Sequence, residues 1–583
     1  MDEYANVWPQ GGLFAFSGVD GETYHGEPFV ASGMADGIGW RFWLGQGLAL
    51  PAHVDGTRVV ARPHPDDFCF PDCWRVHAAA GGHQGRVEGA FVNCHAMVVL
   101  LAFQGLPEGR FPDLDGAGEP GDGGEARVVK GEGWWVALVC DGPAATRRYG
   151  IAVSYQSARE ASERAKAAYE RDLVDVVRAR MTFYEAVTPP ESISGSVRRT
   201  FYKALGVHKV NIESAQKDIP CRWTTPDRMP HRHMWMWDTA FHAVGLQHVR
   251  VDLAEDAIQA LFAKQRADGK LLLAAQPGSP PREEEDTQPP IVCWAVWRIF
   301  ERTGHTEFLK TAYGKLVAYL AWFEANRKKD NGLYGWSVHA DADPVRGARG
   351  GESGMDNSPR FDELAELTAV DLSSYMAAEY LYLEKIAKAL DAEQDAEEWQ
   401  GRREAITDRV NALLWDDEAQ FYFDLDADGE FVAIKTTAGL MPLCGRIPDR
   451  DRAEALRMHV MNPREFWTPL PLPSVAADED TFSKDMWRGP TWINANVLLY
   501  YGLMSYGFFQ EARELAHRSI GEVAAHYMRH GCLYEYYDAT GEQAPRELPR
   551  KGGVGKAGGT GFGVVPDLQW TAASFIHFVH EVS

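Results

Sequence analysis

The sequence predicts a mainly α-helical protein, in which an (α/α)6 barrel, a closed ring of six helical hairpins, follows an antiparallel β-sandwich and a linker helix. Short β-rich runs separated by clusters of glycine, proline and aspartate fill the chain up to about residue 155. Helical periodicity dominates from Ser192 onward. No strand signal separates successive pairs of helices, which excludes a parallel α/β barrel because its units alternate strand and helix.

The expected β-sandwich covers residues 1–155 and rests on runs such as 41–44, 91–94 and 134–139, which are rich in aromatic and β-branched residues. The glycine-rich stretch 105–133 is predicted to be mostly an exposed loop. Residues 156–190 contain an alanine-rich charged segment that ends before two prolines. This composition predicts a helix that links the two domains.

The predicted barrel domain covers residues 191–583. Eleven helices are expected in it, at 197–213, 239–250, 253–267, 292–302, 306–328, 369–390, 395–414, 451–459, 493–506, 509–527 and 568–582. The loops between alternate helices are long and rich in Trp, Gly, Pro and acidic residues, and such loops in a compact helical domain are usually functional. The absence of a repeat of fixed length disfavours a solenoid.

The composition limits the kinds of binding partner that we expect. The formal net charge of −24, from 59 basic and 83 acidic residues, disfavours nucleic acid as a binding partner. The N-terminus lacks the pattern of a secretory signal and no segment reaches the length of a membrane span, so we expect a cytoplasmic protein without membrane contact. The 19 Trp, 21 Tyr and 27 Phe residues suit both a packed core and stacking on sugar rings.

The eight cysteines are scattered, which favours reduced thiols over a disulfide framework. Cys69 and Cys73, together with His64, invite comparison with a zinc site, as does the pair Cys94 and His95. The spacing differs from the usual C-x2-C, so buried thiols are the favoured interpretation.

The string Asp424-x-Asp426-x-Asp428-Gly429 begins like a calcium loop, but Lys435 occupies its twelfth position, where an EF-hand carries glutamate. A hairpin turn between Phe423 and Phe431 is therefore the favoured interpretation. We expect neither a metal nor a cofactor.

Four loops hold the candidate functional residues. In the first, Asp238 lies near a helix start, Phe241 and His242 follow on one face, and Trp235 and Trp237 precede it. Asp238 suits either a helix cap or a sugar-binding carboxylate, and the indoles suit a platform for a sugar ring.

In the second loop, Gln288 opens a helix and suits either a cap or hydrogen bonds with sugar hydroxyls. The third is a glycine-flanked acidic loop, 351–362, in which Arg360 is close enough in sequence to influence the carboxylates. The fourth, 486–496, is followed at a distance by Glu535, which lies among tyrosines and suits either a partly desolvated site or a surface strand.

Taken in order, these loops resemble glycoside hydrolase family 63, the family of processing α-glucosidases and of bacterial mannosylglycerate and glucosylglycerate hydrolases, which is similar to trehalases in the same regions. The strings that carry the resemblance are Trp235-x-Trp237-Asp238-x-x-Phe241-His242, Gln288-Pro289-Pro290, Glu352-Ser353-Gly354-Met355-Asp356-Asn357, Trp487-Arg488-Gly489-Pro490-x-Trp492-x-Asn494 and Tyr534-Glu535-Tyr536-Tyr537-Asp538. They span roughly residues 230 to 540, and residues 1–155 match no motif of the family.

The resemblance implies a glycosidase with Asp356 as general acid and Glu535 as general base. The residues expected to contact the sugar are Trp235, Trp237, Asp238, Phe241, His242, Gln288, Glu352, Trp487, Arg488, Trp492 and Tyr536. An inverting reaction needs room for a water between the two carboxyl groups, which predicts a separation of about 6.5 to 9.5 Å. Asp356 is expected in the drier environment and Glu535 in the wetter one, because the acid must hold its proton.

We therefore expect an exo-acting inverting α-glycoside hydrolase that releases one sugar from an oligosaccharide or small α-glycoside and acts as a monomer or small homo-oligomer. The alternatives are another carbohydrate-active enzyme on this barrel, such as a trehalase, rhamnosidase, phosphorylase or lyase, or a catalytically silent carbohydrate-binding protein. Residues 543–565 are predicted to form a mobile lid. The acidic segment 282–286 would disfavour an anionic leaving group if it faced the pocket.

Overall fold

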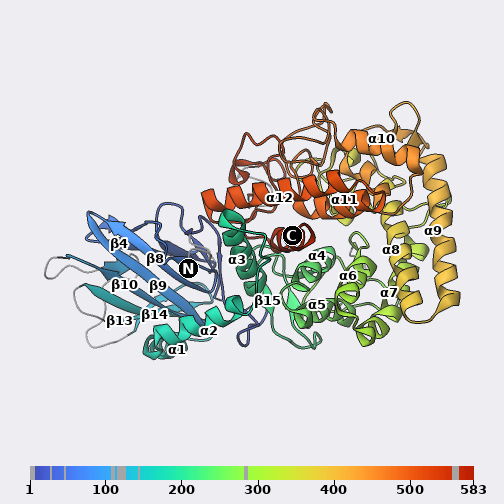
Figure 1. Ribbon diagram of the computed structural model, residues 1–583. Helices are drawn as coiled ribbons and strands as arrows, with labels where there is room; N and C mark the ends of the chain where they lie inside the picture. Colours follow the sequence, from blue (N-terminus) through green and yellow to red (C-terminus); the bar gives the residue numbers. More distant parts are fainter. Residues whose placement is uncertain are drawn as a thin grey trace.

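The computed structural model describes residues 7–26, 29–44, 47–106, 112–114, 126–141, 145–280, 286–553 and 563–583. A β-sandwich lies beside a large helical barrel, and helix α3 lies where the two parts meet (Figure 1). The C-terminal helix lies between α11 and α4. The predicted fold class is confirmed in both parts.

Two antiparallel sheets form the sandwich. The first has the order β1-β2-β3-β4-β11, with β5 paired to β4; the second has the order β12-β13-β14-β10-β9-β8-β6, with β7 paired to β8. Buried aromatic side chains such as Trp40, Trp74 and Phe91 fill the core between the sheets. The strands are β1 Leu13–Phe14, β2 Ala31–Gly33, β3 Gly39–Phe42, β4 Leu48–Val54, β5 Thr57–Arg58, β6 Val60–Ala61, β7 Phe68–Cys69, β8 Cys73–Ala80, β9 His83–Asn93, β10 Ala96–Phe103, β11 Pro112–Leu114, β12 Arg127–Lys130, β13 Trp135–Asp141 and β14 Thr146–Ser154.

The segment predicted as one linker helix forms two helices, α1 Ala158–Glu170 and α2 Leu173–Glu185. Asp172 separates them because its side chain accepts the backbone N–H groups of Val174 and Asp175 and so starts a new helix. Helix α1 buries three alanines against β13 and β14, and it therefore forms a layer of the sandwich rather than a free connection.

The barrel contains all eleven predicted helices. They are α3 Gly195–Val210, α4 Met236–Leu246, α5 Val251–Ala263, α6 Val292–Thr303, α7 Thr306–Asn326, α8 Val370–Ala389, α9 Glu393–Leu413, α10 Arg450–Val460, α11 Ile493–Ser505, α12 Phe509–His530 and α13 Gln569–Glu581. The twelfth position of the ring is a short 3-10 helix, η3 Thr437–Leu443, which contains Pro442. A helix this short shows no periodicity in the sequence, which is why it was not predicted.

The inner ring consists of α4, α6, α8, η3, α11 and α13. Each of these packs against the next, and α13 packs against α4 to close the ring. Every residue of α4 is buried, whereas α9, in the outer layer, buries only four. This difference follows from position, because an inner helix has protein on all sides and an outer helix faces the core with one stripe.

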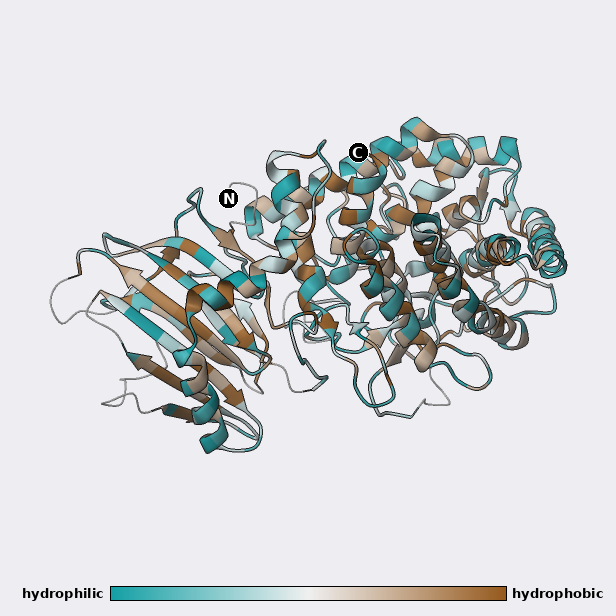
Figure 2. Ribbon diagram, turned by 60° about the horizontal axis from the view of Figure 1, so that its bottom comes forward, coloured by the Kyte–Doolittle hydropathy of each residue, from teal (hydrophilic) through white to brown (hydrophobic). Residues whose placement is uncertain are grey.

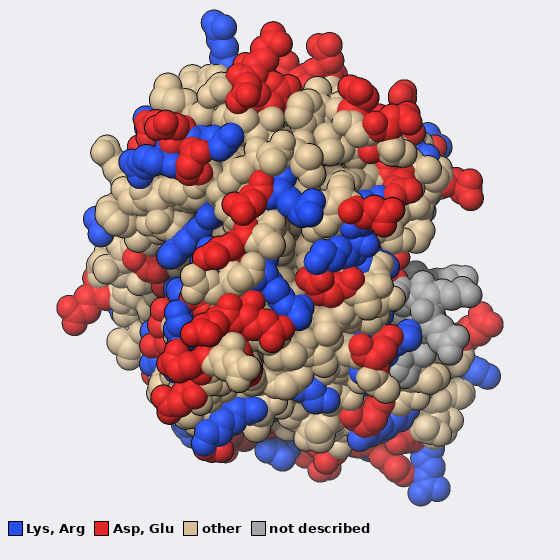
Figure 3. All heavy atoms as spheres, turned by 90° about the vertical axis from the view of Figure 1, so that its right-hand side faces the viewer, with Lys and Arg blue, Asp and Glu red and all other residues tan. Residues whose placement is uncertain are grey.

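Polar residues are concentrated on the outer helices and apolar residues on the inner elements (Figure 2). Acidic and basic side chains are interspersed over the barrel face opposite the sandwich (Figure 3). Among the described residues, no helix is long and apolar enough to cross a membrane.

A buried ion pair helps to join the two parts. The Nζ atom of Lys203, on α3, lies 2.8 Å from Asp567 Oδ2. Asp567 also accepts the backbone N–H groups of Leu13 in the sandwich and Leu533 in the barrel. One buried carboxylate therefore connects three segments that are far apart in the sequence.

Candidate active site

The loops between the helices meet around one small cavity of about 80 Å³. Asp356 and Glu535 both line it, so the two predicted catalytic carboxylates face the same space. Six of the predicted sugar-binding residues line it as well, namely Trp235, Trp237, Asp238, Gln288, Trp487 and Trp492. The structure thus brings together residues that the sequence places in four separate loops.

Several contacts hold Glu535 in place in the cavity lining. It is 3% exposed, and its backbone N–H donates to the carbonyl of Val565 over 2.9 Å. The guanidinium of Arg550 pairs with both carboxylate oxygens, with Nε 3.1 Å from Oε2 and Nη2 3.2 Å from Oε1. Glu535 therefore has a fixed orientation and a charge partner.

Asp356 is the more accessible of the two carboxylates. Its side chain is 24% exposed against 4% for Glu535, and its Oδ2 lies 2.7 Å from Lys551 Nζ. The expectation of a dry acid and a wet base is wrong for this structure. The difference comes from tertiary packing. Glu535 is enclosed by the segment around Val565, whereas the more exposed Asp356 follows a short 3-10 turn, η1 Gly351–Ser353.

One tight turn, residues 550–553, supplies both basic partners. Lys551 and Gly552 at its tip have φ angles of 52° and 76°, and the N–H of Arg550 donates to Gly553 O over 2.7 Å. Asp485 accepts the backbone N–H groups of Lys551 and Gly552, at 2.7 and 2.6 Å. The described part of the predicted lid is therefore fixed to the site, and residues 554–562 of that prediction lie outside the described residues.

Asp238 lies in the first turn of α4 rather than at its cap, because Trp235 occupies the cap position. Its side chain is 4% exposed and lines the cavity. Burial raises the pKa of Asp238 to about 7, against the lowering effect of His231. Asp238 is therefore a carboxyl group that carries a proton in part of its population at neutral pH.

Gln288 acts as a helix cap, which is one of the two roles that the sequence left open. Its Oε1 accepts the backbone N–H of Trp237 over 3.1 Å at the start of α4, so it caps a neighbouring helix rather than its own. Its side chain still lines the cavity.

Aromatic side chains form the cavity wall. Trp487 and Trp492 stack with their ring centroids 3.9 Å apart, and Trp237 contacts Trp487 at 6.2 Å and Trp570 at 5.6 Å. Gly354 is essential to this packing, because a Cβ at that position would lie 2.5 Å from the Trp237 indole and its φ is 72°. The glycine therefore fixes how far Trp237 reaches toward Asp356.

Two predicted sugar-binding residues lie behind the wall instead of in it. Phe241 packs edge-on against Trp237, with centroids 5.9 Å apart. His242 is fully buried, with its Nδ1 3.0 Å from Thr224 Oγ1, and burial lowers its pKa far below the usual value. Both support α4 and neither lines the cavity.

Glu352 and Arg488 are also supporting residues rather than lining ones. Glu352 is fully buried, accepts the backbone N–H of Thr287 over 3.1 Å and pairs with Arg327. Arg488 makes a bidentate pair with Asp362, both contacts at 2.7 Å. These two ion pairs hold the loop that carries Asp356.

Tyr536 is the last predicted residue outside the cavity. Its hydroxyl donates to Pro549 O over 2.7 Å, and its ring contacts Trp492 at 4.7 Å. It therefore positions the turn that carries Arg550.

Sequence reasoning missed several cavity residues, chiefly His231, Arg550 and Trp570. His231 connects Asp227 to Arg550: its Nδ1 lies 2.8 Å from Asp227 Oδ2 and its Nε2 lies 3.2 Å from Arg550 Nη2. The signal in the sequence that pointed to Arg550 is its position next to Lys551, because two consecutive basic residues stand out in a chain rich in acidic residues.

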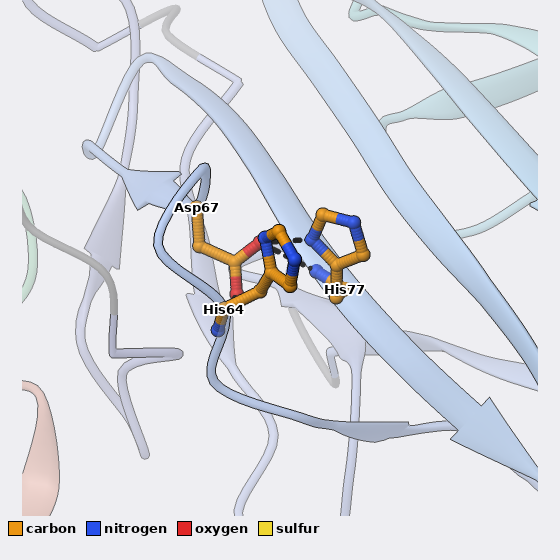
Figure 4. Close-up of side chains that lie close together, drawn as sticks. All are labelled: His64, Asp67 and His77. Carbon is orange, nitrogen blue, oxygen red and sulfur yellow. Dashed lines mark hydrogen bonds and ion pairs between the residues drawn. The ribbon is translucent and has the colours of Figure 1, made fainter. Parts of the chain in front are cut away.

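No cysteine takes part in a metal-binding group among the described residues. All eight cysteines are in the reduced form, and burial raises the pKa of Cys69 to about 12. His64 instead lies with Asp67 and His77 (Figure 4). Asp67 accepts the backbone N–H groups of both histidines, so this cluster anchors a loop of the sandwich.

The predicted hairpin between Phe423 and Phe431 is confirmed, because β21 Asp424–Leu425 pairs antiparallel with β22 Phe431–Val432. Asp424 turns inward to Arg360, with its Oδ2 3.0 Å from Nη1. This aspartate therefore belongs to a buried ion pair rather than to a calcium loop.

Comparison with known proteins places the chain in a family. The mannosylglycerate hydrolase MGH1-like glycoside hydrolase domain family matches residues 231–563, which is more than half of the chain and contains all the cavity carboxylates. The chain belongs to this family, within glycoside hydrolase family 63. It is a glycosidase by family, and the β-sandwich lies outside the matched region.

Two relatives illustrate the extent of the similarity. The chain is 27% identical over 409 residues to a mannosylglycerate hydrolase of Thermus thermophilus, which covers 56% of this chain and 94% of that protein. It is 28% identical over 239 residues to an uncharacterised protein of Borreliella burgdorferi and spans 47% of that protein's length.

Two solved structures show the fold. The mannosylglycerate hydrolase of Thermus thermophilus in complex with Tris has a TM-score of 0.52 at 24% identity and covers 65% of this chain and 99% of its own. A bacterial glucoamylase complexed with acarbose has a TM-score of 0.63 at 10% identity and covers 99% of this chain and 94% of its own. The second similarity extends over the sandwich as well as the barrel.

Proposed function

We propose that this protein is an exo-acting, inverting α-glycoside hydrolase in which Asp356 is the general acid and Glu535 the general base. The observation that carries the proposal is that both carboxylates line one cavity together with Asp238, Gln288 and a wall of indoles. A sugar ring needs an aromatic face to stack on and polar groups at its edge, and this cavity offers both.

In this mechanism Asp356 protonates the departing glycosidic oxygen and Glu535 removes a proton from the water that attacks the anomeric carbon. The more exposed carboxylate suits the acid, because a departing group needs an open path out of the cavity. The enclosed carboxylate suits the base, because its contacts with Arg550 fix the orientation of its two oxygens. Lys551 must release Asp356 before that carboxyl can take up and donate a proton.

The small volume of the cavity, about 80 Å³, supports removal of one sugar at a time. The relatives named mannosylglycerate hydrolase and mannosyl-oligosaccharide glucosidase make α-mannosides and α-glucosides the first substrates to try. Residues 282–286 form the acidic segment that was expected to disfavour an anionic leaving group. They lie outside the described residues except for Asp286.

The test is a proton NMR time course on an α-glycoside. An inverting enzyme releases the β-anomer first, and accumulation of the α-anomer would refute inversion. Asp356→Asn and Glu535→Gln should each lower kcat by about 10² to 10⁴. Glu363→Gln, an exposed carboxylate in the loop of Asp356, is the matched control and should keep full activity. Wild-type turnover by either catalytic variant would refute its assignment.

A further inference from the structure

The guanidinium of Arg550 is held by two acceptors that lie on different segments of the chain. Its Nη2 atom, which carries two hydrogens, lies 3.2 Å from Glu535 Oε1 and 3.2 Å from His231 Nε2. Its Nε atom lies 3.1 Å from Glu535 Oε2. His231 is therefore the contact that ties this side chain to a group other than its charge partner.

Asp227 holds the opposite edge of the His231 ring. Its Oδ2 lies 2.8 Å from Nδ1 of the imidazole, and its Oδ1 accepts the backbone N–H of the same histidine over 3.1 Å. Asp227 is 2% exposed, so both contacts are shielded from solvent. The imidazole also packs edge-on against Trp235, with ring centroids 5.9 Å apart. The position and the orientation of the imidazole are thus both fixed by the protein.

The chemistry of the two neighbours fixes the direction of these hydrogen bonds. A carboxylate oxygen can only accept, and a guanidinium can only donate. Nδ1 of His231 must therefore carry a hydrogen toward Asp227, and Nε2 must offer its lone pair to Arg550. This arrangement is the neutral imidazole with its proton on Nδ1, because the partner of one ring nitrogen decides the role of the other.

A second proton on His231 would break this arrangement, because Nε2 would then present a donor to the donor of Arg550. Burial lowers the pKa of His231, but the charge and the hydrogen bond of Asp227 together raise it by more, so the pKa lies above its usual value. The other charged groups that act on the imidazole are Arg550, Glu535 and Asp238. The accepting form of His231 is therefore the form present at alkaline pH.

We propose that Asp227 and His231 are positioning residues for the general base. Asp227 selects the tautomer in which His231 accepts a hydrogen bond from Arg550. His231 in turn holds the Arg550 guanidinium against Glu535. This rests on the proposed function, since it serves the carboxylate that is assigned there as the base. Without this acceptor the guanidinium can turn away, and a carboxylate that is 3% exposed loses its charge partner. A buried carboxylate without a partner favours its protonated form, which cannot take a proton from water.

Asp227→Asn tests the tautomer directly. Because the backbone N–H of His231 needs an acceptor, the amide oxygen should stay at the position of Oδ1, which puts the amide NH2 group opposite Nδ1. Nδ1 then accepts and Nε2 carries the hydrogen, so a donor faces Arg550. The readout is the 15N spectrum of histidine-labelled protein at pH 8.5, in which His231 is assigned by the signals that His231→Gln removes. Wild type should show a protonated Nδ1 and a bare Nε2, and Asp227→Asn should show the reverse. A protonated Nε2 in wild type would overturn the proposal, whatever the protein hydrolyses.

A double-mutant cycle on an α-glycoside tests whether His231 acts through Arg550. Asp227→Asn and His231→Phe, which keeps a ring but has no acceptor, should each lower kcat by about 10- to 100-fold and change KM by less than about threefold. In an Arg550→Met background the same changes should cost less than about twofold, because no guanidinium is left to hold. His231→Gln, whose amide oxygen can accept, should be more active than His231→Phe. Full losses in the Arg550→Met background, or a change in KM alone, would indicate direct contact with the sugar and would overturn the proposal.

A similar pair in the sandwich provides the matched control. Asp67, whose side chain is 2% exposed, has its Oδ1 2.7 Å from Nδ1 of His77 and 2.8 Å from the backbone nitrogen of the same residue (Figure 4). Asp67→Asn should disturb the packing of a buried carboxylate and leave kcat and KM unchanged. A fall in kcat equal to that of Asp227→Asn would mean that lost stability explains both, and it would overturn the proposal. If wild type hydrolyses no glycoside, the proposed function fails and the positioning role with it, whereas the wrong tautomer in wild type refutes the positioning role alone.

Discussion

Replacing Asp238 by asparagine should make the protein more stable and less active. In the unfolded chain this carboxyl ionises near pH 3.9. In the folded protein burial raises the pKa of Asp238 to about 7, against the opposing effect of His231. Between these values the folded state binds a proton that the unfolded state releases, so the free energy of unfolding falls as pH rises from about 4 to about 7.

The size of this effect follows from the two pKa values. Each pH unit between them corresponds to about 1.4 kcal/mol, which gives about 4 kcal/mol of lost stability above pH 7. Between pH 5 and pH 8 the free energy of unfolding should fall by about 3 kcal/mol. Asparagine has nearly the same shape and does not ionise, so the advantage of Asp238→Asn over wild type should grow by about that amount across the interval.

Thermal or denaturant unfolding of both proteins at pH 5 and pH 8 measures this difference. An α-glycoside assay measures the expected loss of at least about tenfold in kcat/KM, because the substitution removes the carboxyl group that is proposed to bind the sugar. Asp408→Asn, an exposed carboxylate on α9, is the control and should change stability by the same small amount at both pH values. A stability difference for Asp238→Asn that does not change with pH would refute the reasoning.

Three further predictions concern packing and charge. Gly354→Ala should displace Trp237, because its Cβ would lie 2.5 Å from the indole at a φ of 72°. We expect kcat/KM to fall by at least about tenfold and the free energy of unfolding in denaturant to fall by about 1 to 3 kcal/mol. Wild-type kinetics would contradict this. Lys203→Met should destabilise the protein by about 3 to 5 kcal/mol, because it leaves Asp567 buried and unpaired, and adding Asp567→Asn should recover part of the loss. Burial lowers the pKa of His577 to about 3. In the unfolded chain the same imidazole takes up a proton near pH 6.5. The free energy of unfolding should therefore fall as the pH drops below 6.5, by about 3 kcal/mol between pH 6 and pH 4. His577→Gln should flatten that decline in a pH series of melting curves, and an unchanged decline would exclude His577 as its source.

The sequence by itself determined the helices and the motifs. Periodicity located the eleven α-helices found in the described residues of the barrel, because an amphipathic or buried pattern is a local property of the chain. It failed for η3, where Pro442 and a length of seven residues leave no pattern, and at Asp172, whose cap divided the predicted linker helix. The motifs identified Asp356 and Glu535 without any knowledge of where they lie.

Only the tertiary structure decided which motif residues face the cavity. Asp238 and Gln288 line it, whereas Glu352 and Arg488 hold its loops through ion pairs with Arg327 and Asp362. A carboxylate that binds a ligand and one that binds a neighbouring arginine look alike in a sequence. Their roles depend on partners that only chain folding brings within hydrogen-bond distance.

The same holds for the environment of the two proposed catalytic carboxylates. Arg550 and Lys551 are adjacent in the chain, yet one contacts Glu535 and the other Asp356, because a tight turn fixed by Asp485 points their side chains to different carboxylates. Burial and pairing of a charge are set by everything packed around it. For that reason the chain alone could name the two carboxylates, while the packed structure was needed to show which one is enclosed.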